Sequence, residues 1–241
     1  MSVSRSILAS VTVASLFMVP ATATASASPP SSMVPQSAPQ AIQQASRYDT
    51  SIRFLDFDHT RAYLTHANIR GQVVATIGDR RGGLKGVRVR LDRKIAGTRT
   101  WKYVDTAVTS RTDYPKFRFS PRSVANAAYR VRFAGNDRLQ PSRAVTSVAV
   151  HRNFNARMED GTGHFHGKMG PRYRHHIVLL EKRSCAACGW HKVSTHRTGD
   201  YSRWSFKVGA PRDGRWWWRV STPSTTRYVR SFSGIFTTEV R

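Results

Sequence analysis

The chain of 241 residues is poor in acidic residues, with 14 aspartates and glutamates against 39 lysines and arginines. No local carboxylate pair of the kind used in glycoside hydrolysis stands out, and G-x-S-x-G, H-E-x-x-H and P-loop motifs are missing. We therefore predict that the protein is not an enzyme. The alternatives are a small secreted hydrolase or enzyme inhibitor with its site residues on loops, and a secreted toxin or signalling factor.

Cysteine is almost absent, since Cys185 and Cys188 in "SCAACGWH" are the only two. A redox C-x-x-C pair would need a helix N-terminus in a thioredoxin-like context, which the surrounding sequence lacks. A zinc site would need His191 or His196 as further ligands, at a spacing that fits no common site. A short disulfide suits an exported protein, so we predict a Cys185–Cys188 staple and expect no metal and no cofactor.

Long hydrophobic runs are also lacking, apart from one between residues 7 and 19. This run is too short to span a bilayer and is followed by small-x-small sites, so residues 1–27 are predicted to be a signal peptide. Residues 28–47 are rich in Pro, Ser and Gln and are predicted to be a disordered leader. We expect a protein without a transmembrane segment that is secreted or associated with the cell wall.

The formal net charge of +25 at pH 7 predicts attraction to anionic partners. A wall phosphate polymer or an acidic polysaccharide would fit, and non-specific binding of nucleic acid in vitro would follow from the same charge. Arginine accounts for 31 of the 39 basic residues. This bias is typical of a GC-rich genome, which we favour as its cause, and it would also suit phosphate recognition by arginine forks.

From about residue 48 onward, short alternating apolar runs are separated by Gly, Pro, Asp and Ser clusters, which predicts an all-β fold. Residues 87–109 align with residues 176–198 at an offset of 89, and Gly71 and Gly167 occupy similar places on the first strands. We predict two tandem immunoglobulin-like β-sandwiches, at residues 48–151 and 152–241. The matched pairs are Leu91 with Leu180, Asp92 with Glu181, Trp101 with Trp190, Tyr129 with Trp218, and Val131 with Val220.

The pattern V-x-L-x-R, then W-x-x-V-x-T, an aromatic-x-aromatic strand and Y/W-R-V resembles bacterial immunoglobulin-like repeats of exported actinobacterial surface proteins. The resemblance spans nearly the whole chain after the leader, and its motifs are packing motifs. It implies a spacer, an adhesive unit or a binding appendage of the kind that is sometimes attached to hydrolases. We expect no catalytic domain in this chain. The inter-sheet cysteine pair of antibody-type domains is missing, and fold by itself does not define function.

The run "GRWWWRVST" contains three consecutive tryptophans. Because side chains alternate across a strand, Trp216 and Trp218 are predicted to point into the core and Trp217 outward with Arg215 and Arg219. An outward tryptophan between arginines suits stacking on sugars or bases, although Trp217 would also be explained by packing under a loop or on arginine stems. Trp101 and Trp190 are expected to be buried together with Trp218.

The outward basic residues of the first repeat are expected on both of its sheets, Arg88 and Arg90 on one and Arg130 and Arg132 on the other. Charge on both faces predicts diffuse, salt-sensitive adhesion by an envelope-associated binding or structural module. The candidate ligand-binding residues are Trp217, Arg215, Arg219, Arg130 and Arg132.

The second repeat has an apolar strand, "IVLL", with Ile177 and Leu179 at positions where the first repeat has outward arginines. An apolar outer face predicts cover by self-association, by interdomain contact or by a loop. This strand is expected on the sheet opposite Trp217. His164 and His166 share a strand face and could bind metal adventitiously, but exposed strand histidines without a metal are more common, so no metal site is predicted.

Overall fold

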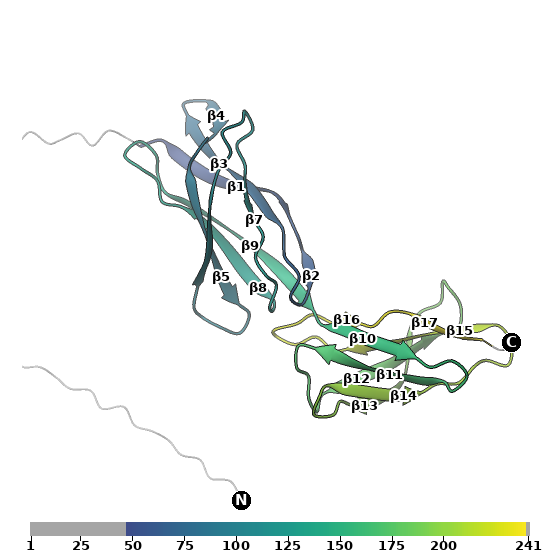
Figure 1. Ribbon diagram of the computed structural model, residues 1–241. Coiled ribbons are helices and arrows are strands. Elements are labelled where there is room, and N and C mark those ends of the chain that lie inside the picture. The colour runs from purple at the N-terminus through teal and green to yellow at the C-terminus, as the bar shows by residue number, and fades with distance from the viewer. Residues whose placement is uncertain (1–46, 240–241) are drawn as a thin grey trace, which may run out of the picture. The chain divides into compact units, whose positions relative to one another are not determined.

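The computed structural model describes residues 47–239. The predicted signal peptide (residues 1–27) and all but the last residue of the predicted leader (28–47) lie outside this range. Every regular element in the described range is a β-strand, which confirms the predicted all-β fold (Figure 1). Those residues form no helix long and apolar enough to cross a membrane.

Strands β1 to β9 form two sheets. In the first, β3 (Ile69–Ile77) pairs with β1 (Asp49–Phe57), β4 (Arg80–Gly83) and β7 (Phe117–Phe119). The second has the order β2 (Thr60–Ala62), β9 (Ser142–His151), β8 (Ala127–Phe133), β5 (Arg88–Ile95) and β6 (Lys102–Val108). All these pairings are antiparallel except the parallel pairing of β2 with β9.

Strands β10 to β17 form two further antiparallel sheets. One has the order β10 (Asn153–Met158), β11 (His164–Gly170) and β14 (Arg203–Lys207). The other has the order β13 (His191–Arg197), β12 (Ile177–Arg183), β15 (Arg215–Thr222) and β16 (Ser231–Phe232), with β17 (Phe236–Glu239) also pairing with β15.

Each pair of sheets encloses its own hydrophobic cluster, which is the arrangement of a β-sandwich. The first cluster takes residues between positions 52 and 148, and the second takes residues between 154 and 236. Buried side chains recur at every second position of β8, as the alternation of apolar residues predicted. The division into two immunoglobulin-like domains at residue 151 stays a prediction.

The tryptophan run follows the predicted alternation. Trp218 is only 3% exposed and Val220 is fully buried, while Trp216 is half-buried and packs against the second cluster. The Trp218 indole Nε1 donates a hydrogen bond of 2.9 Å to Thr238 Oγ1 on β17. Its ring lies 5.9 Å from that of Trp216. Two of the three tryptophans therefore belong to the core.

The two matched glycines share a packing role. Gly71 pairs with Phe117, and a Cβ at position 71 would lie 2.4 Å from the Phe117 ring. Gly167 pairs with Trp204, and a Cβ at position 167 would lie 2.7 Å from the Trp204 ring and 2.4 Å from the Asn155 carbonyl oxygen. In both places an aromatic ring packs over the glycine, in the space that the side chain of any other residue would occupy.

We expect Gly167→Ala to destabilise the protein by about 1–3 kcal/mol, because the added methyl group displaces either the Trp204 ring or the β10 backbone. Urea unfolding measures the loss. Gly189→Ala is the control, since no heavy atom of the described part of the chain lies within 4 Å of a Cβ at that position. Equal stability of the two variants would contradict this packing role.

Candidate anion-binding site

Three arginines lie side by side across strands β5, β8 and β9. Arg90 pairs with Arg132, and Arg132 pairs in turn with Arg143. The expectation that Arg90 and Arg132 lie on different sheets is wrong, because β5 and β8 are neighbours in one sheet although about 40 residues separate them along the chain. Basic charge is therefore gathered on one face of this sheet.

Such a row is unfavourable for folding by itself. Neighbouring strands are about 4.7–4.9 Å apart, and like charges directly opposite each other destabilise a sheet. All three side chains are at least partly exposed. The repulsion within this row is offset locally by one carboxylate.

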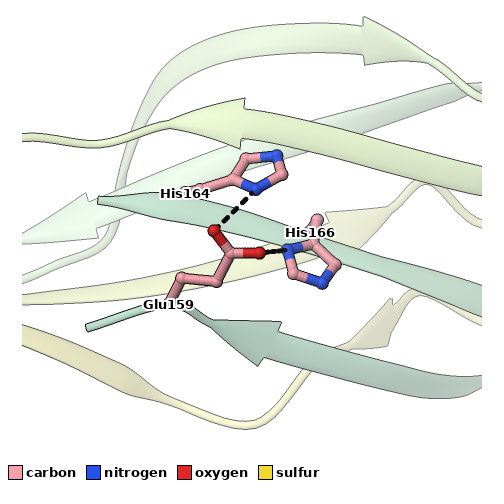
Figure 2. Close-up of side chains that lie close together, drawn as sticks. All are labelled: Glu159, His164 and His166. Carbon is pink, nitrogen blue, oxygen red and sulfur yellow. Dashed lines mark ion pairs between the residues drawn. The ribbon is translucent and has the colours of Figure 1, made fainter. Parts of the chain in front are cut away.

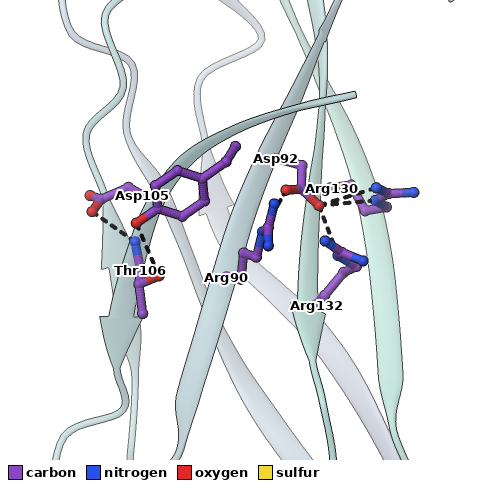
Figure 3. A network of polar contacts seen from close by, with 7 residues as sticks. Arg90, Asp92, Asp105, Thr106, Arg130 and Arg132 are labelled. Carbon is purple, nitrogen blue, oxygen red and sulfur yellow. Dashed lines mark hydrogen bonds and ion pairs between the residues drawn. The ribbon is translucent and has the colours of Figure 1, made fainter. Parts of the chain in front are cut away.

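That carboxylate belongs to Asp92, whose side chain is only 2% exposed and is surrounded by arginines (Figure 3). Arg90 Nε donates to Oδ1 at 2.8 Å, and Arg130 Nη2 donates to Oδ2 at 3.1 Å. Arg132 Nε forms an ion pair with Oδ2 at 2.8 Å. One negative charge thus orients three positive ones, which leaves this group with a net charge of +2.

The pKa of Asp92 is lowered from its usual value. Burial alone would raise the pKa, but the hydrogen bonds from Arg90 and Arg130 and the charge of Arg132 outweigh burial. Asp92 is therefore ionised at neutral pH and holds the guanidinium groups in place.

A shallow surface pocket of about 560 Å³ opens beside this network. We call it the arginine pocket. It is lined by Arg90, Arg132, Phe133, Ala134, Pro141, Ser142 and Arg143. Tyr103, which is exposed, lies beside the pocket residue Arg90, with the guanidinium 4.9 Å from the ring centroid. Arginine forks combined with an aromatic surface can hold a phosphate, sulfate or carboxylate group carried on a sugar or polymer chain.

Part of the arginine network recurs in the second repeat. Asp92 pairs with Arg130 on the neighbouring strand, and Glu181 pairs with Arg219 at the same offset of 89 residues. Arg219 Nε donates to the Glu181 carboxylate at 2.8 Å, and Arg230 also binds that carboxylate. A buried acid that binds a cross-strand arginine is therefore a structural element common to both repeats.

A tryptophan completes each copy of this element. The guanidinium of Arg130 lies 4.4 Å from the Trp101 ring, and that of Arg219 lies 4.2 Å from the Trp190 ring. The expectation that Trp101 and Trp190 are buried in the core is wrong: both are half-exposed and belong to neither hydrophobic cluster. Each stands just before a strand and covers an arginine by a cation–π contact.

Two arginines of the arginine pocket have no counterpart in the second repeat. The positions that match Arg90 and Arg132 are occupied by Leu179 and Ser221. Glu181 therefore has two arginine partners, Arg219 and Arg230, where Asp92 has three. The cross-strand neighbours Arg90 and Arg132 occur only in the first repeat, and the packing of the repeated element does not require them.

The other residues predicted as ligand contacts lie on β15. Arg215 forms an ion pair with Glu239 at 2.6 Å, and Arg219 is paired with Glu181. Trp217 is half-buried and lies 5.6 Å from the guanidinium of Arg183. The structure thus places Trp217, Arg215 and Arg219 along one strand, and it places Arg130 and Arg132 on β8 of another sheet.

Cys185 and Cys188 form a disulfide in the turn between β12 and β13. The carbonyl of Ala186, inside this turn, accepts a hydrogen bond of 2.7 Å from Arg183 Nη1. Arg183 in turn lies 4.9 Å from the Trp190 ring. The turn therefore supports the aromatic and arginine side chains on the outer face of this sheet.

The apolar strand of the second repeat is β12, which pairs directly with β15. The expectation that β12 lies on the sheet opposite Trp217 is therefore wrong. As with β5 and β8, two strands that are distant in sequence are neighbours in one sheet. Ile177 is exposed and Leu179 is half-buried. Self-association or interdomain contact through these residues stays a prediction.

Sequence reasoning identified Arg130 and Arg132 but missed Arg90, Arg143 and Asp92 as members of one site. Asp92 was recognised only as a position matched by Glu181. A buried acid that recurs beside a cross-strand arginine is the signal that identifies the site, and it can be used only once the pairing of β5 with β8 is known.

No family model matches the chain, and no curated protein matches it. The chain is similar at a low level to solved structures, among them the following three. The sulfur carrier protein SoxY from Chlorobium limicola f thiosulfatophilum is 12% identical, with a TM-score of 0.28 over 44% of this chain and 86% of that one. Tp47, the 47-kilodalton lipoprotein of Treponema pallidum, is 8% identical, with a TM-score of 0.31 over 80% and 50%.

Salmonella alpha-2-macroglobulin, as the mutant Y1175G, is 10% identical, with a TM-score of 0.31. The match covers 78% of this chain and 14% of that one. Similarity at these TM-scores supports no conclusion about function. The sandwich architecture implied by the resemblance to immunoglobulin-like repeats is present, and membership of that family stays a prediction.

Proposed function

We propose that the protein is an exported, non-catalytic module that binds anionic polymers at the bacterial envelope through the arginine pocket. The row formed by Arg90, Arg132 and Arg143, with Asp92 as its one bound carboxylate, is the observation that carries this proposal. The ligand class is a chain bearing repeated phosphate, sulfate or carboxylate groups.

The chemistry of the pocket favours binding over catalysis. Arginine stays protonated at all physiological pH values and supplies fixed donors, so it holds anions but does not transfer protons. Asp92 is ionised and engaged by three arginines, and therefore does not act as a general acid. The pocket is shallow and open, which suits a segment of a long polymer.

The test is the affinity of the purified protein for fluorescent polyphosphate and for heparin, measured by anisotropy over a range of salt concentrations. We expect log K to fall linearly with log[salt], because bound arginines release counterions. Replacing Arg132 and Arg143 together by glutamine should weaken binding and reduce the slope by about 2, one for each lost contact.

Arg81→Gln is the matched control, because Arg81 is exposed on β4, which belongs to the other sheet of the same sandwich. An equal loss in the Arg81 variant would show diffuse attraction and contradict a site at the arginine pocket. Affinity that does not change with salt would contradict electrostatic binding altogether. A higher affinity for polyphosphate than for heparin would identify phosphate as the preferred group.

A further inference from the structure

Three potential metal ligands converge at one end of the sheet formed by β10, β11 and β14. Glu159 follows the last residue of β10, and His164 and His166 lie on the same face of β11 (Figure 2). One carboxylate oxygen of Glu159 lies 3.2 Å from His164 Nδ1, and the other lies 3.6 Å from His166 Nδ1. One ligand atom from each residue lies within 4.8 Å of the other two.

The β10–β11 hairpin explains why these residues meet. The Glu159 amide donates to the His164 carbonyl at 3.0 Å, which places Glu159 directly across from His164. Gly161 and Gly163 in the connecting turn have positive φ angles of 75° and 64°, which glycine adopts without strain. Residues 164 and 166 then share a face because side chains alternate along a strand.

The distances within the cluster agree with those around a bound ion. Two ligands each bound about 2.0–2.1 Å from a tetrahedral ion lie about 3.4 Å apart. Each histidine Nδ1 lies close to this distance from one of the two Glu159 oxygens. His166 Nδ1 is buried and has no hydrogen-bond partner among the described residues. Buried polar atoms are rarely left without a partner, and a metal ion at this point would provide one.

We infer that Glu159, His164 and His166 form a binding site for a divalent transition metal ion, with Zn²⁺ as the ion that the spacing fits best. Two imidazoles and one carboxylate are a common ligand set for zinc. Ca²⁺ and Mg²⁺ prefer oxygen ligands, and this cluster offers one carboxylate. The site is independent of the proposed anion binding, because it uses different residues on a different sheet.

The surroundings of the cluster fit this choice. Arg157 pairs with His166, and Lys207 pairs with His164, both on the exposed side of their strands. Two neighbouring cations repel any divalent ion, so they disfavour an ion held by charge alone more than one whose affinity comes from direct bonds to imidazole nitrogen. Glu159 also lines an open pocket of about 710 Å³, which gives an ion access to the carboxylate.

Ser205 supports one of the ligands from outside. Its hydroxyl lies 2.6 Å from His164 Nε2, the ring nitrogen that faces away from the cluster. A hydrogen bond at Nε2 orients the ring and leaves Nδ1 for the ion, as outer partners of metal-bound histidines usually do. We therefore assign Ser205 as a positioning residue.

The experiment uses the untagged, chelator-treated protein titrated with Zn²⁺ by calorimetry, together with histidine side-chain NMR. We expect one ion per chain and shifts confined to two histidines. His164→Ala and His166→Ala should each weaken binding at least 100-fold, and Ser205→Ala about 10-fold, in keeping with the range known for outer partners of metal ligands. In Ser205→Ala the same two histidine resonances should shift, but at a higher Zn²⁺ concentration.

His175→Ala is the matched control. His175 Nε2 lies 3.0 Å from Asp200, which gives it a histidine–carboxylate pair without the second histidine. This variant should bind Zn²⁺ as the unchanged protein does. The inference is overturned if the His164 and His166 variants titrate like the unchanged protein, or if Zn²⁺ shifts all exposed histidines alike. Circular dichroism of each variant separates lost binding from lost folding.

Discussion

Alanine in place of Trp218 is expected to destabilise the protein by about 3–5 kcal/mol and to unfold the sandwich built on the second hydrophobic cluster. The indole is almost fully buried and packs with Phe165, Leu180 and Trp204 in that cluster. Its removal leaves a cavity that the surrounding strands cannot close, and Thr238 loses its indole donor. Urea unfolding followed by circular dichroism measures the loss.

Trp217→Ala is the control, because it removes the same side chain one position away on the outer face of β15. Trp217 is half-buried and contacts the Arg183 guanidinium, so we expect a loss of about 1 kcal/mol or less. The predicted role of Trp217 in ligand binding is tested on the same variant, as weaker binding with nearly unchanged stability. A larger loss for Trp217→Ala than for Trp218→Ala would mean that the facing of β15 is reversed.

The inward faces of the strands could be predicted from sequence because alternation is a local property. Trp218 and Val220 were placed correctly from the pattern of β15 alone, and Gly71 and Gly167 were matched by the repeat. Trp101 and Trp190 were misplaced because they stand just before a strand, where alternation does not apply. Their rings cover arginines that are adjacent in space and about 29 residues away in sequence.

The candidate site could not be assembled from sequence because strand pairing is not local. The row of Arg90, Arg132 and Arg143 exists only because β5, β8 and β9 are neighbours. The burial of Asp92 could not be predicted for the same reason. Asp92 follows the buried Leu91, so alternation places it on the outer face. It is buried because arginine side chains from the neighbouring strand cover it.

The proposed metal cluster could not be assembled from sequence for a related reason. His164 and His166 were recognised as sharing a face, but a pair of histidines is not enough to predict a site. Glu159 enters the cluster through the turn between β10 and β11, and its position depends on the backbone of that turn. The sequence signal is an acid five residues before the first histidine, with two glycines between them.

Asp92→Asn is expected to lower stability by about 2–4 kcal/mol at pH 7, because it removes the charge that offsets the repulsion within the arginine row. The value is below that for a fully buried ion pair, since Arg90 and Arg132 are partly exposed and solvent screens their charges. Asp105→Asn is the control, because Asp105 is exposed and its side chain, among residues 47–239, accepts a hydrogen bond only from the neighbouring Thr106 amide (Figure 3). Thermal and urea unfolding measure both variants.

The loss in Asp92→Asn should depend on pH. The pKa of Asp92 is lowered in the folded protein, with burial opposed by the hydrogen bonds from Arg90 and Arg130 and the charge of Arg132. Its contribution is therefore fully present above the unfolded value of about 3.9 and is lost as the pH falls through the lower folded value. The stability difference between the two proteins should be constant from pH 7 to 5 and shrink below pH 4. A difference that persists unchanged at pH 2.5 would contradict ionisation of Asp92 as the cause.

The same variant connects the stability of the arginine row to its proposed function. Without the carboxylate, a bound polyanion is the remaining source of negative charge for Arg90 and Arg132. Polyphosphate should therefore raise the melting temperature of Asp92→Asn more than that of the unchanged protein, because ligand that binds only the folded state stabilises that state. Asp105→Asn should respond like the unchanged protein. Equal shifts in all three proteins would mean that the polymer binds away from the arginine pocket.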